Sequence, residues 1–410
     1  MKTIATVPLG EVADIAAGIT LGRKDPEEEL FEVPYLRVAN VQDGRLDLDD
    51  LKTVKATKRE IEKWSLLPGD LLLTEGGDPD KLGRGACWEG QIPRCIHQNH
   101  IFRVRLPADY FDPDFVSYQM ASPYGKSYFF AHAKKTTGIA SINQKVLKAF
   151  PLHAPSKSTQ REIKVILQQQ LAAVATASGA ASKVVKDTVA LKTSAYTTLF
   201  NHVTPIAALP LIQASPAGWE WVRLDEIARL ESGHTPSRSR PDWWGGDVSW
   251  VSLTEIRALD GKWVDSTQLR TNEHGIANSA ARILPSGTVC FSRTASVGFV
   301  TIMGQPMATS QDFANWVCGE DLDPEFLMQA LICSRPALRE LATGATHKTI
   351  YMPTLKNFHI CAPPINEQRS IVKALKSQLA EAETLAQAAQ AQFDDLSALP
   401  QRLLAQAFES

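Results

Sequence analysis

The sequence lacks the features that mark membrane proteins, secreted proteins and metalloproteins. No apolar run in its 410 residues approaches the ~20 residues that a membrane-spanning helix needs. The beginning, MKTIATVPLGEV, has no basic segment followed by a long apolar core, so it does not resemble a secretory signal. The six cysteines form no CxxC pair and no Cys/His set at zinc spacing. These absences predict a cytoplasmic protein with reduced thiols, no metal site and no membrane association.

Catalytic motifs are also missing. The sequence has no Gly-rich cofactor loop after a strand, no Asn/Asp-Pro-Pro-aromatic motif, no GxxxxGK[ST] loop, and no GxSxG or HExxH motif. We therefore expect no catalytic residue and no cofactor of the chain's own. A self-contained DNA methyltransferase is disfavoured, and failure of the isolated chain to bind S-adenosylmethionine would exclude it.

Positive charge is not in excess, but it is unevenly distributed. The chain has 43 Lys and Arg against 45 Asp and Glu, a net charge of −2 at pH 7. From Phe115 to Arg161 there is no acidic residue, yet seven Lys and Arg fall there. Acidic residues cluster elsewhere, as in DPEEELFE (25–32) and DLDDL (47–51). A basic surface opposed to an acidic one fits a protein that binds nucleic acid.

What the sequence does contain is a copy of itself. VPLGEVADIAAGIT (7–20) returns as VRLDEIARLESGHT (222–235), and FDPDFV (111–116) returns as LDPEFL (322–327). SINQKVLKAFPLHAP (141–155) returns as TIYMPTLKNFHICAP (349–363). Two copies of one unit suit a ligand that is recognised at two places, and DNA with two half-sites is the leading candidate. Positions alike in both copies are expected to build the shared fold: Leu9/Leu224, Pro68/Pro285, Gln98/Gln311 and Phe150/Phe358.

Each repeat divides into a globular part and a helical part. Residues 1–155 and 217–363 have short β-rich runs separated by Gly, Pro and Asp, which predicts mixed domains with a twisted sheet. Within them, 112–133 and 323–342 open on Asp-Pro and are predicted helices, with Asp as N-cap and Pro as the first residue. Residues 204–216, rich in Pro and Ala, form the linker between the copies.

The helical parts, residues 156–203 and 364–410, contain almost no helix breaker apart from Pro400. Apolar residues such as Ile371, Leu375 and Leu379 recur there at steps of three and four, and Ser158 and Asn366 are candidate N-caps. The predicted fold class is α+β. It comprises two similar mixed α/β domains, each followed by a long helix, and the two helices pair as an antiparallel coiled coil with pseudo-twofold symmetry.

Candidate DNA contacts lie on Gly-flanked loops at matching places in the two copies, with the residue types that contact phosphates and base edges. A solvated surface role is the alternative for each residue, and the paired recurrence favours the set. In the first copy the candidates are Thr20, Arg23, Lys24, Arg84, Lys134, Lys135, Asn143 and Lys145. In the second they are Thr235, Ser237, Arg238, Arg240, Arg293, His347 and Lys348.

The ordered set of motifs resembles one family over essentially the whole chain. GWEWVRLDEIARLESGHTPSR (218–238), DVSWVSLTEI (247–256) and APPINEQRSIVKAL (362–375) are similar to the specificity subunit of type I restriction-modification systems. The first copy departs from this pattern in two ways. It lacks the Pro-x-Gly-Trp entry of residues 216–219, and it has SKSTQR (156–161) where the second copy has PINEQR (364–369).

The resemblance implies a non-catalytic subunit whose two target-recognition domains each bind one half of a split sequence in double-stranded DNA. It implies that the coiled coil sets the spacer and docks two modification subunits, which bind S-adenosylmethionine and methylate adenine. Restriction and motor subunits would join with ATP and Mg²⁺. The partner-binding residues on the helices are expected to be Gln160, Arg161, Leu167, Gln368, Arg369 and Leu375.

Two other hypotheses remain open at this point. The same module could serve another multi-subunit modification or phage-defence system that does not cleave DNA. A protein-binding coiled-coil scaffold is a different class. It predicts no salt-dependent DNA binding and no effect of charge reversal at Lys134 and Lys135.

Overall fold

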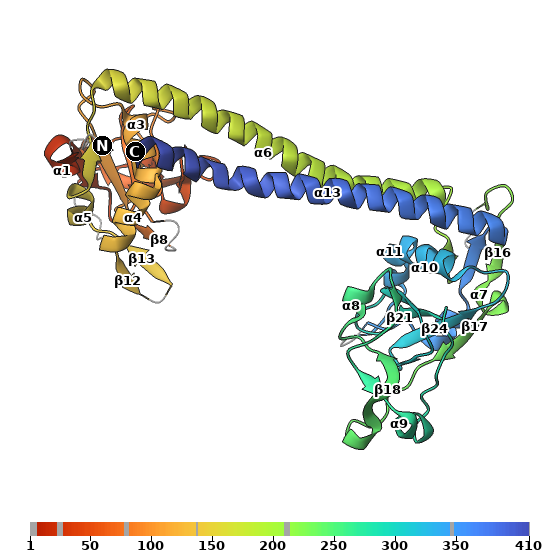
Figure 1. The fold of residues 1–410 in the computed structure, drawn as a ribbon. Coiled ribbons are helices and arrows are strands. Elements are labelled where there is room, and N and C mark those ends of the chain that lie inside the picture. Colours follow the sequence, from red (N-terminus) through yellow and green to blue (C-terminus); the bar gives the residue numbers. More distant parts are fainter. Residues whose placement is uncertain are drawn as a thin grey trace. The chain divides into compact units, whose positions relative to one another are not determined.

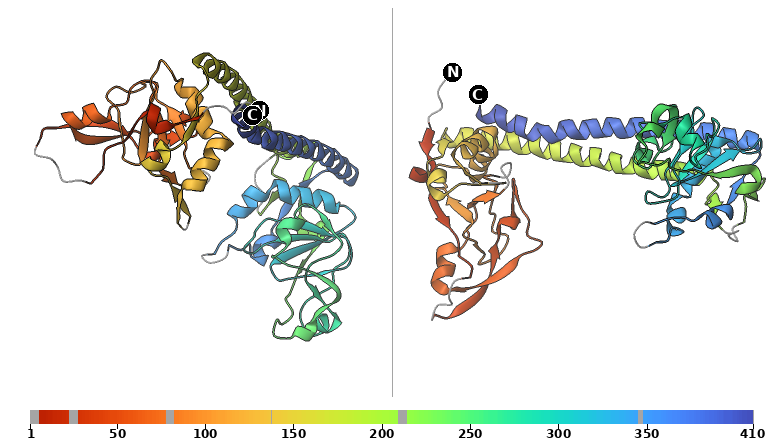
Figure 2. Two further views of the ribbon diagram at one scale, coloured as in Figure 1. Left: turned by 60° about the vertical axis from the view of Figure 1, so that its left-hand side comes forward. Right: turned by 90° about the horizontal axis from the view of Figure 1, so that it is seen from below.

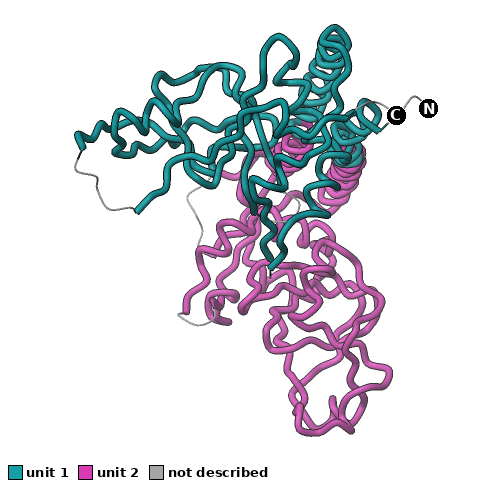
Figure 3. Tube along the Cα trace, turned by 90° about the vertical axis from the view of Figure 1, so that its left-hand side faces the viewer, with its two compact units in different colours: residues 1–183, 390–410 teal, residues 184–389 magenta. Residues whose placement is uncertain are grey.

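The structure, a computed structural model, describes residues 6–22, 28–77, 82–136, 138–208, 214–344 and 348–409. The chain forms two units, residues 1–183 with 390–410 and residues 184–389 (Figure 3). Each unit therefore contains one globular domain and a part of both long helices.

The first globular domain alternates short strands with short helices and leads into a long helix (Figure 1). Its elements in chain order are β1 (Thr6–Pro8), α1 (Leu9–Val12), β2 (Asp14–Ala17), β3 (Leu30–Leu36), η1 (Val38–Asn40), β4 (Val41–Gln42), β5 (Arg45–Leu46), β6 (Lys52–Thr57), α2 (Lys58–Trp64), β7 (Leu71–Thr74), β8 (Gly76–Gly77), β9 (Gly85–Cys87), β10 (Ile96–His97), β11 (Ile101–Arg105), α3 (Pro113–Ala121), α4 (Pro123–His132), β12 (Lys134–Thr136), β13 (Ile139–Ser141), α5 (Gln144–Lys148), β14 (Pro151–His153) and α6 (Lys157–Leu199).

The second globular domain repeats this order. Its elements are β15 (Ile206–Ala207), β16 (Glu220–Arg223), α7 (Leu224–Ile227), β17 (Ala228–Ser232), η3 (Pro241–Trp243), β18 (Trp244–Val251), α8 (Ile256–Leu259), β19 (Trp263–Val264), β20 (Arg270–Thr271), α9 (Glu273–Ala277), β21 (Val289–Ser292), β22 (Val300–Met303), β23 (Ala308–Thr309), β24 (Phe313–Cys318), α10 (Pro324–Cys333), α11 (Arg335–Glu340), α12 (Met352–Lys356), β25 (His359–Ala362) and α13 (Ile365–Phe408).

A central antiparallel sheet forms the core of each domain. In the first domain its strand order is β2-β11-β7-β9. In the second domain the equivalent strands β17-β24-β21-β22 are extended by β19, which is parallel to β22. Leu71 and Leu73 pack in the cluster that holds Phe115 of α3, whereas Leu72 packs in a second cluster with Trp88. Both faces of β7 are therefore covered, which explains its unbroken run of leucines.

A parallel strand pair also occurs at the same place in both domains. Tyr35 of β3 lies opposite Ile96 of β10, and Trp250 of β18 lies opposite Ala308 of β23. The terminal strands pair similarly, since β1 is antiparallel to β14 and β16 is antiparallel to β25. The repeat in the sequence is thus a repeat of topology.

The strand registers correct two of the pairings predicted from the repeat. The amide of Gln98 donates to Leu36, and the amide that makes the equivalent bond to Val251 belongs to Ser310. Gln98 therefore corresponds to Ser310, not Gln311. Likewise Asp70 N donates to Leu67 O and Thr288 N donates to Pro285 O, so Pro285 corresponds to Leu67 instead of Pro68. One-residue differences in loop length displace identical residues from equivalent positions.

Helices α6 and α13 lie side by side and run antiparallel (Figures 1 and 2). In the first unit, Leu167 near the start of α6 shares a core cluster with Leu404 and Phe408 at the end of α13. In the second unit, Ala195 near the end of α6 shares a cluster with Leu375 near the start of α13. The predicted fold class, with its two mixed domains and paired long helices, is confirmed.

A seven-residue repeat of buried positions forms the seam between the helices. On α6 these positions are Leu167, Val174, Ala181, Thr188 and Ala195, and on α13 they include Leu375, Ala382 and Ala389. The small alanines allow close approach of the two backbones, and the seven-residue spacing is that of a coiled coil. Helix α13 continues through Pro400, which has no amide hydrogen to donate to the preceding turn.

The predicted helix starts were right for the short helices and wrong for the long ones. Asp112 caps α3 and Asp323 caps α10, each accepting two backbone N–H groups. Each predicted segment, however, divides into two helices, at Ser122 and at Ser334. Ser158 lies inside α6, whose first turn is instead capped by the hydroxyl of Ser156 accepting from Thr159 N at 3.3 Å. Asn366 likewise lies inside α13.

The six cysteines are free thiols, as predicted. Within the described ranges, no group of His, Cys, Asp and Glu side chains could hold a metal ion. No helix in these same ranges combines the length and the apolarity required to cross a membrane.

Candidate nucleic-acid interface

In each domain, the first candidate loop begins after a glycine that packs closely against a neighbouring backbone. A Cβ atom on Gly18 would lie 1.8 Å from the carbonyl oxygen of His97, and one on Gly233 would lie 2.1 Å from that of Ser310. Only glycine allows this approach. The loops that carry Thr20 and Thr235 therefore start from equivalent anchored positions. Arg23 and Lys24, which follow Thr20, lie outside the described residues.

A basic hairpin projects from the first domain. Strands β12 and β13 pair with each other, so Lys134 lies opposite Ser141 and Lys135 opposite Ala140, and β13 also pairs with β8. Both lysines are exposed, and Lys135 Nζ lies 3.6 Å from the centroid of the Phe130 ring. Lys145 is exposed on the neighbouring helix α5. The hairpin and α5 therefore present cations that are suited to contact phosphates.

Two other candidates in the first domain make contacts within the chain. The side-chain oxygen of Asn143 caps α5 by accepting from Val146 N at 2.9 Å. The guanidinium of Arg84 donates to Gln42 Oε1 at 2.9 Å and is half-buried. Asn143 therefore has a structural role, and one nitrogen of Arg84 is engaged within the domain.

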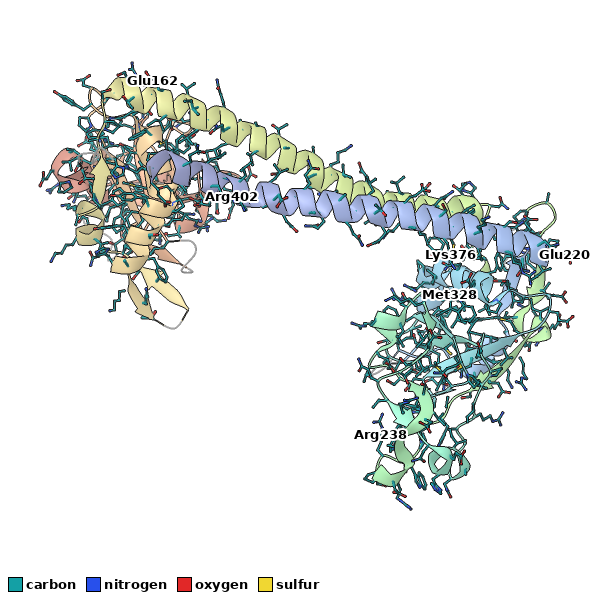
Figure 4. All side chains as sticks on the ribbon, viewed as in Figure 1. Glu162, Glu220, Arg238, Met328, Lys376 and Arg402 are labelled. Carbon is teal, nitrogen blue, oxygen red and sulfur yellow. The ribbon has the colours of Figure 1, made fainter. Side chains whose placement is uncertain are left out.

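The most developed candidate surface is an arginine held on two tryptophans in the second domain. Arg238 lies at the end of this domain that is remote from α10 and α11 (Figure 4). Its guanidinium carbon is 4.5 Å from the ring centroid of Trp244 and 5.3 Å from that of Trp250. The two indoles pack edge to face with centroids 4.9 Å apart. Stacking fixes the plane of the guanidinium while its N–H groups stay available, which is the arrangement that suits recognition of a base edge.

Polar residues surround this arginine. Thr235 Oγ1 donates to Gln311 Oε1 at 2.5 Å, and the hydroxyls of Ser237 and Ser239 lie 2.8 Å apart. The carbonyl oxygen of Ser237 accepts from Trp244 Nε1 at 3.1 Å, which ties the loop to the tryptophans. The loop is thus ordered by its own contacts.

Arg240 and Arg293 are less available than Arg238. Arg240 forms a bidentate pair with Asp242, at 3.0 and 2.7 Å, which occupies two of its N–H groups. Arg293 donates twice to the carbonyl oxygen of Gln311, at 3.1 and 2.7 Å. Burial lowers the pKa of Arg293 below its ordinary value. These contacts assign Arg293 a role in holding its loop.

The last candidate loop of the second domain is described from Lys348 onward, and His347 lies outside the described residues. Lys348 is exposed, and its carbonyl oxygen accepts from Ala295 N at 2.9 Å. This bond ties Lys348 to the turn between β21 and β22.

The comparisons with known proteins agree with this arrangement. Residues 216–391 match the family described as the type I restriction modification DNA specificity domain. The type I restriction enzyme MjaX specificity subunit of Methanocaldococcus jannaschii is 24% identical over 349 residues, which cover 84% of this chain and 80% of that protein. Residues 216–391 belong to this family, and over most of its length the chain is similar to specificity subunits of type I restriction-modification systems.

Two further similarities are of different kinds: one is a sequence match over part of the chain, and the other is a structural match over nearly all of it. The MjaIX specificity subunit of the same organism is 25% identical over 162 residues, which span only 38% of its length. A chain from a structure that concerns complex assembly and conformational transition of the type I R-M system superposes with a TM-score of 0.72 at 18% identity. The match covers 98% of this chain and 97% of that one. This likeness extends the shared fold to both domains and both helices.

The predicted partner-binding residues fall into two groups. Gln160 Oε1 accepts from Asp112 N at 3.0 Å, and its amide nitrogen donates to Tyr110 O and Pro155 O. Gln368 makes the same set of bonds, to Asp323 N, Asp321 O and Pro363 O. Because both glutamines are buried and fully engaged, they join each long helix to its own domain and present no side-chain atoms to a partner.

Leu167 and Leu375 are also buried, in the cores of their units. Arg161 and Arg369 are exposed beside the glutamines, and Arg369 Nε is 3.7 Å from Asp323 Oδ2. Contact with a partner subunit remains a prediction for these two arginines only.

The sequence analysis missed Arg257 and Arg339, which line a cavity together with Lys348. The two arginines come from helices α8 and α11, which are distant in the chain. No spacing in the sequence could indicate that they meet.

Proposed function

We propose that each globular domain of this chain recognises one half of a bipartite target in double-stranded DNA. The observation that carries the proposal is the duplication of one topology on one chain, with each copy joined to a long helix by the same buried glutamine. Two equivalent binding units connected in this way suit two half-sites on one duplex. The stacked Arg238 and the basic hairpin of Lys134 and Lys135 are the side chains best placed for DNA contact.

The helix pair sets the distance between the two half-sequences in this proposal. A helix of 43 residues such as α6 spans about 65 Å at ~1.5 Å per residue. Half-sites one turn of DNA apart are separated by ~34–36 Å, so the helices are long enough to act as a spacer. The heptad seam supports a stiff connection, since neither helix is left unsupported along its length.

Partner subunits supply the catalysis in this proposal. Two modification subunits would hold S-adenosylmethionine and methylate adenine, and restriction or motor subunits would bring ATP and Mg²⁺, all in the cytoplasm. Apolar side chains left exposed on the helix pair are available to pack against such subunits, because burying them on docking would be favourable. They are Val165, Ile166, Val189, Leu191 and Leu385, with exposed fractions of 47 to 65%.

The test is to co-express the chain with the methyltransferase subunit encoded beside it and to sequence the genomic DNA with single-molecule detection of N6-methyladenine. We expect a new motif in two parts separated by a fixed unspecific gap. Cells that express the methyltransferase subunit alone are the control and should lack the motif.

Two outcomes would contradict the proposal. Methylation in one contiguous motif would mean that a single domain recognises DNA. No new methylation, with the partner shown to be bound and active, would favour the scaffold hypothesis or a defence complex that does not methylate.

A further inference from the structure

A basic cavity of about 260 Å³ lies in the second domain beside the loop that carries Lys348. Among the described residues, its lining consists of three cations and of side chains that carry no charge, without a carboxylate. These residues are Arg257, Ala295, Ser296, Val297, Phe299, Arg339, Ala342 and Lys348.

A phenylalanine ring organises the arginines of this cavity. The guanidinium carbons of Arg257 and Arg339 lie 5.8 and 5.6 Å from the centroid of Phe299. A third guanidinium, that of Arg335, lies 5.3 Å from the same centroid and is neutralised by Asp260, with two N–O distances of 2.7 and 2.8 Å. An aromatic face attracts cations without neutralising them, so the ring gathers positive charge that remains available.

The other two guanidinium groups have no carboxylate partner among the described residues. Arg339 Nε donates to the carbonyl oxygen of Val297 at 3.0 Å, which orients its plane and leaves its terminal nitrogens for a ligand. Arg257 is exposed, and its guanidinium carbon lies over the Phe299 ring. Three cations around one cavity repel one another unless an anion binds between them.

The turn at the rim of the cavity is held in an unusual conformation. Ala295 has a φ of +56°, a region that costs roughly 1–2 kcal/mol for a residue with a Cβ atom. Its amide donates to the carbonyl oxygen of Lys348, so the strained turn and Lys348 are fixed against each other. Strain of this kind is concentrated at ligand sites, because binding requires the geometry to be set in advance.

In the first domain an arginine occupies the chain position that corresponds to Phe299. Gly85 lies opposite Leu73, and Val300 lies opposite Phe291, so the residue before β9 corresponds to the residue before β22. Arg84 therefore corresponds to Phe299. Its Nε is buried and has no hydrogen-bond partner among the described residues. The residue that gathers the arginines in the second domain is thus replaced by an arginine in the first.

We propose that Arg257, Arg339 and Lys348 form a binding site for one phosphodiester of the DNA backbone. The forked guanidinium groups match the oxygens of a phosphate, and the ammonium of Lys348 adds a point charge. This inference rests on the proposed function, since it assigns a phosphate contact to the second recognition domain. Such a contact positions the DNA and carries no sequence information.

The test measures DNA binding by the methyltransferase complex that contains the full chain, over a series of salt concentrations. Target and non-target duplexes are compared for the wild type and the R257Q/R339Q variant. We expect the variant to bind both duplexes about tenfold more weakly, the size of a lost charged hydrogen bond. The slope of log affinity against log salt should fall by about 1, and the methylated sequence should stay the same.

Two further variants control for charge and for folding. R223Q removes an arginine that is paired with Asp225 outside the cavity, and it should bind DNA as the wild type does. R257K/R339K keeps the charge and loses the forks, so it should restore the salt slope without restoring the full affinity. The midpoint of thermal unfolding shows whether each variant is folded.

Three results are decisive. If R257Q/R339Q is folded and binds DNA like R223Q with an unchanged salt slope, the phosphate site is refuted. If the wild type binds inorganic phosphate in this cavity and DNA does not displace it, the site takes a free anion and not the DNA backbone. If the wild-type complex binds no DNA, the proposed function itself has failed, whatever the variants do.

Discussion

At the scale of single residues, the orientation of an arginine separates the side chains that can recognise a base from those that hold a loop. Arg238 is stacked on Trp244 and faces no carboxylate among the described residues, whereas Arg240 is occupied by Asp242. An arginine with a fixed plane and available N–H groups can make the two parallel bonds that guanine offers in the major groove.

We predict that R238K changes the methylated motif in one half only. The lysine keeps the charge and loses the fork, so discrimination at one position should fall by about 1–3 kcal/mol while the other half-sequence is retained. The measurement is single-molecule sequencing of methylated DNA, and R240K is the matched control. Relaxed recognition in both halves would contradict the assignment of one half-site to each domain.

A buried histidine makes the first domain sensitive to acid. His97 has no exposed surface, and its Nδ1 lies 3.2 Å from Ile101 O. Burial lowers the pKa of His97 from 6.5 to about 4, and the positive charge of Arg103 contributes. Between these two values the unfolded chain binds a proton that the folded domain excludes, so stability falls as the pH decreases from about 6.5 to about 4.

The expected loss is on the order of 3 kcal/mol over this range, measured as the free energy of unfolding of the first unit at a series of pH values. In H97Q this part of the pH dependence should disappear. An H97Q variant with the same pH dependence as the wild type would show that another group is responsible.

Residue contacts are also where sequence patterns predict least. The predicted DNA-contact residues were chosen by residue type and loop position. In the structure, Asn143 and Arg293 make hydrogen bonds within the chain. Asn143 accepts from the amide of Val146, and Arg293 donates to the carbonyl oxygen of Gln311. Only the fold brings such partners together. Arg257 and Arg339 were not predicted because helices distant in the chain bring them to one cavity.

At the scale of elements, the junction between each domain and its helix depends on one glutamine. Gln160 and Gln368 each satisfy one backbone N–H and two backbone carbonyls in a buried position. Leucine at either site would leave these groups without partners, at a cost of about 1–3 kcal/mol for each unsatisfied group.

We predict that Q160L destabilises the first unit and Q368L the second, each by at least about 2 kcal/mol. Chemical unfolding monitored by hydrogen exchange shows which unit has lost stability. Q169L, on the exposed side of α6, should have little effect. Equal stability of Q160L and Q169L would show that the Gln160 hydrogen bonds do not stabilise the junction.

Elements were predicted from the sequence better than contacts were. Apolar residues at steps of three and four predicted both long helices, and Asp-Pro predicted the starts of α3 and α10, because these signals are local. The divisions at Ser122 and Ser334 were missed. Proline is at the first or second position of the helix that follows each serine. Proline is common at the start of a helix, so it can begin a new helix as well as end the preceding one.

At the scale of the whole molecule, the length of the helix pair is predicted to determine the spacer of the DNA target. The ion pair between Lys192 and Glu383 shows the register in which α6 and α13 lie side by side. Removing residues 182–188 and 387–393 together deletes one heptad from each helix and preserves the seam.

The shortened chain should methylate the same two half-sequences with a spacer about 3 base pairs shorter, since seven residues span about 10 Å of helix and a base pair about 3.4 Å. Loss of activity with intact assembly would show that the shortened gap is not accessible to the partner subunits. Altered half-sequences with an unchanged spacer would contradict the prediction that the helix pair determines the spacer length.

The end of α13 packs inside the core of the first domain, where the rings of Phe408 and Phe115 meet edge to face with centroids 5.3 Å apart. The ribosome adds Phe408 293 residues after Phe115 (408 − 115), which takes roughly 15–60 s at about 5–20 residues per second. The first domain cannot complete its core during that interval. We therefore expect a product that lacks the end of α13 to have an incomplete core in its first domain.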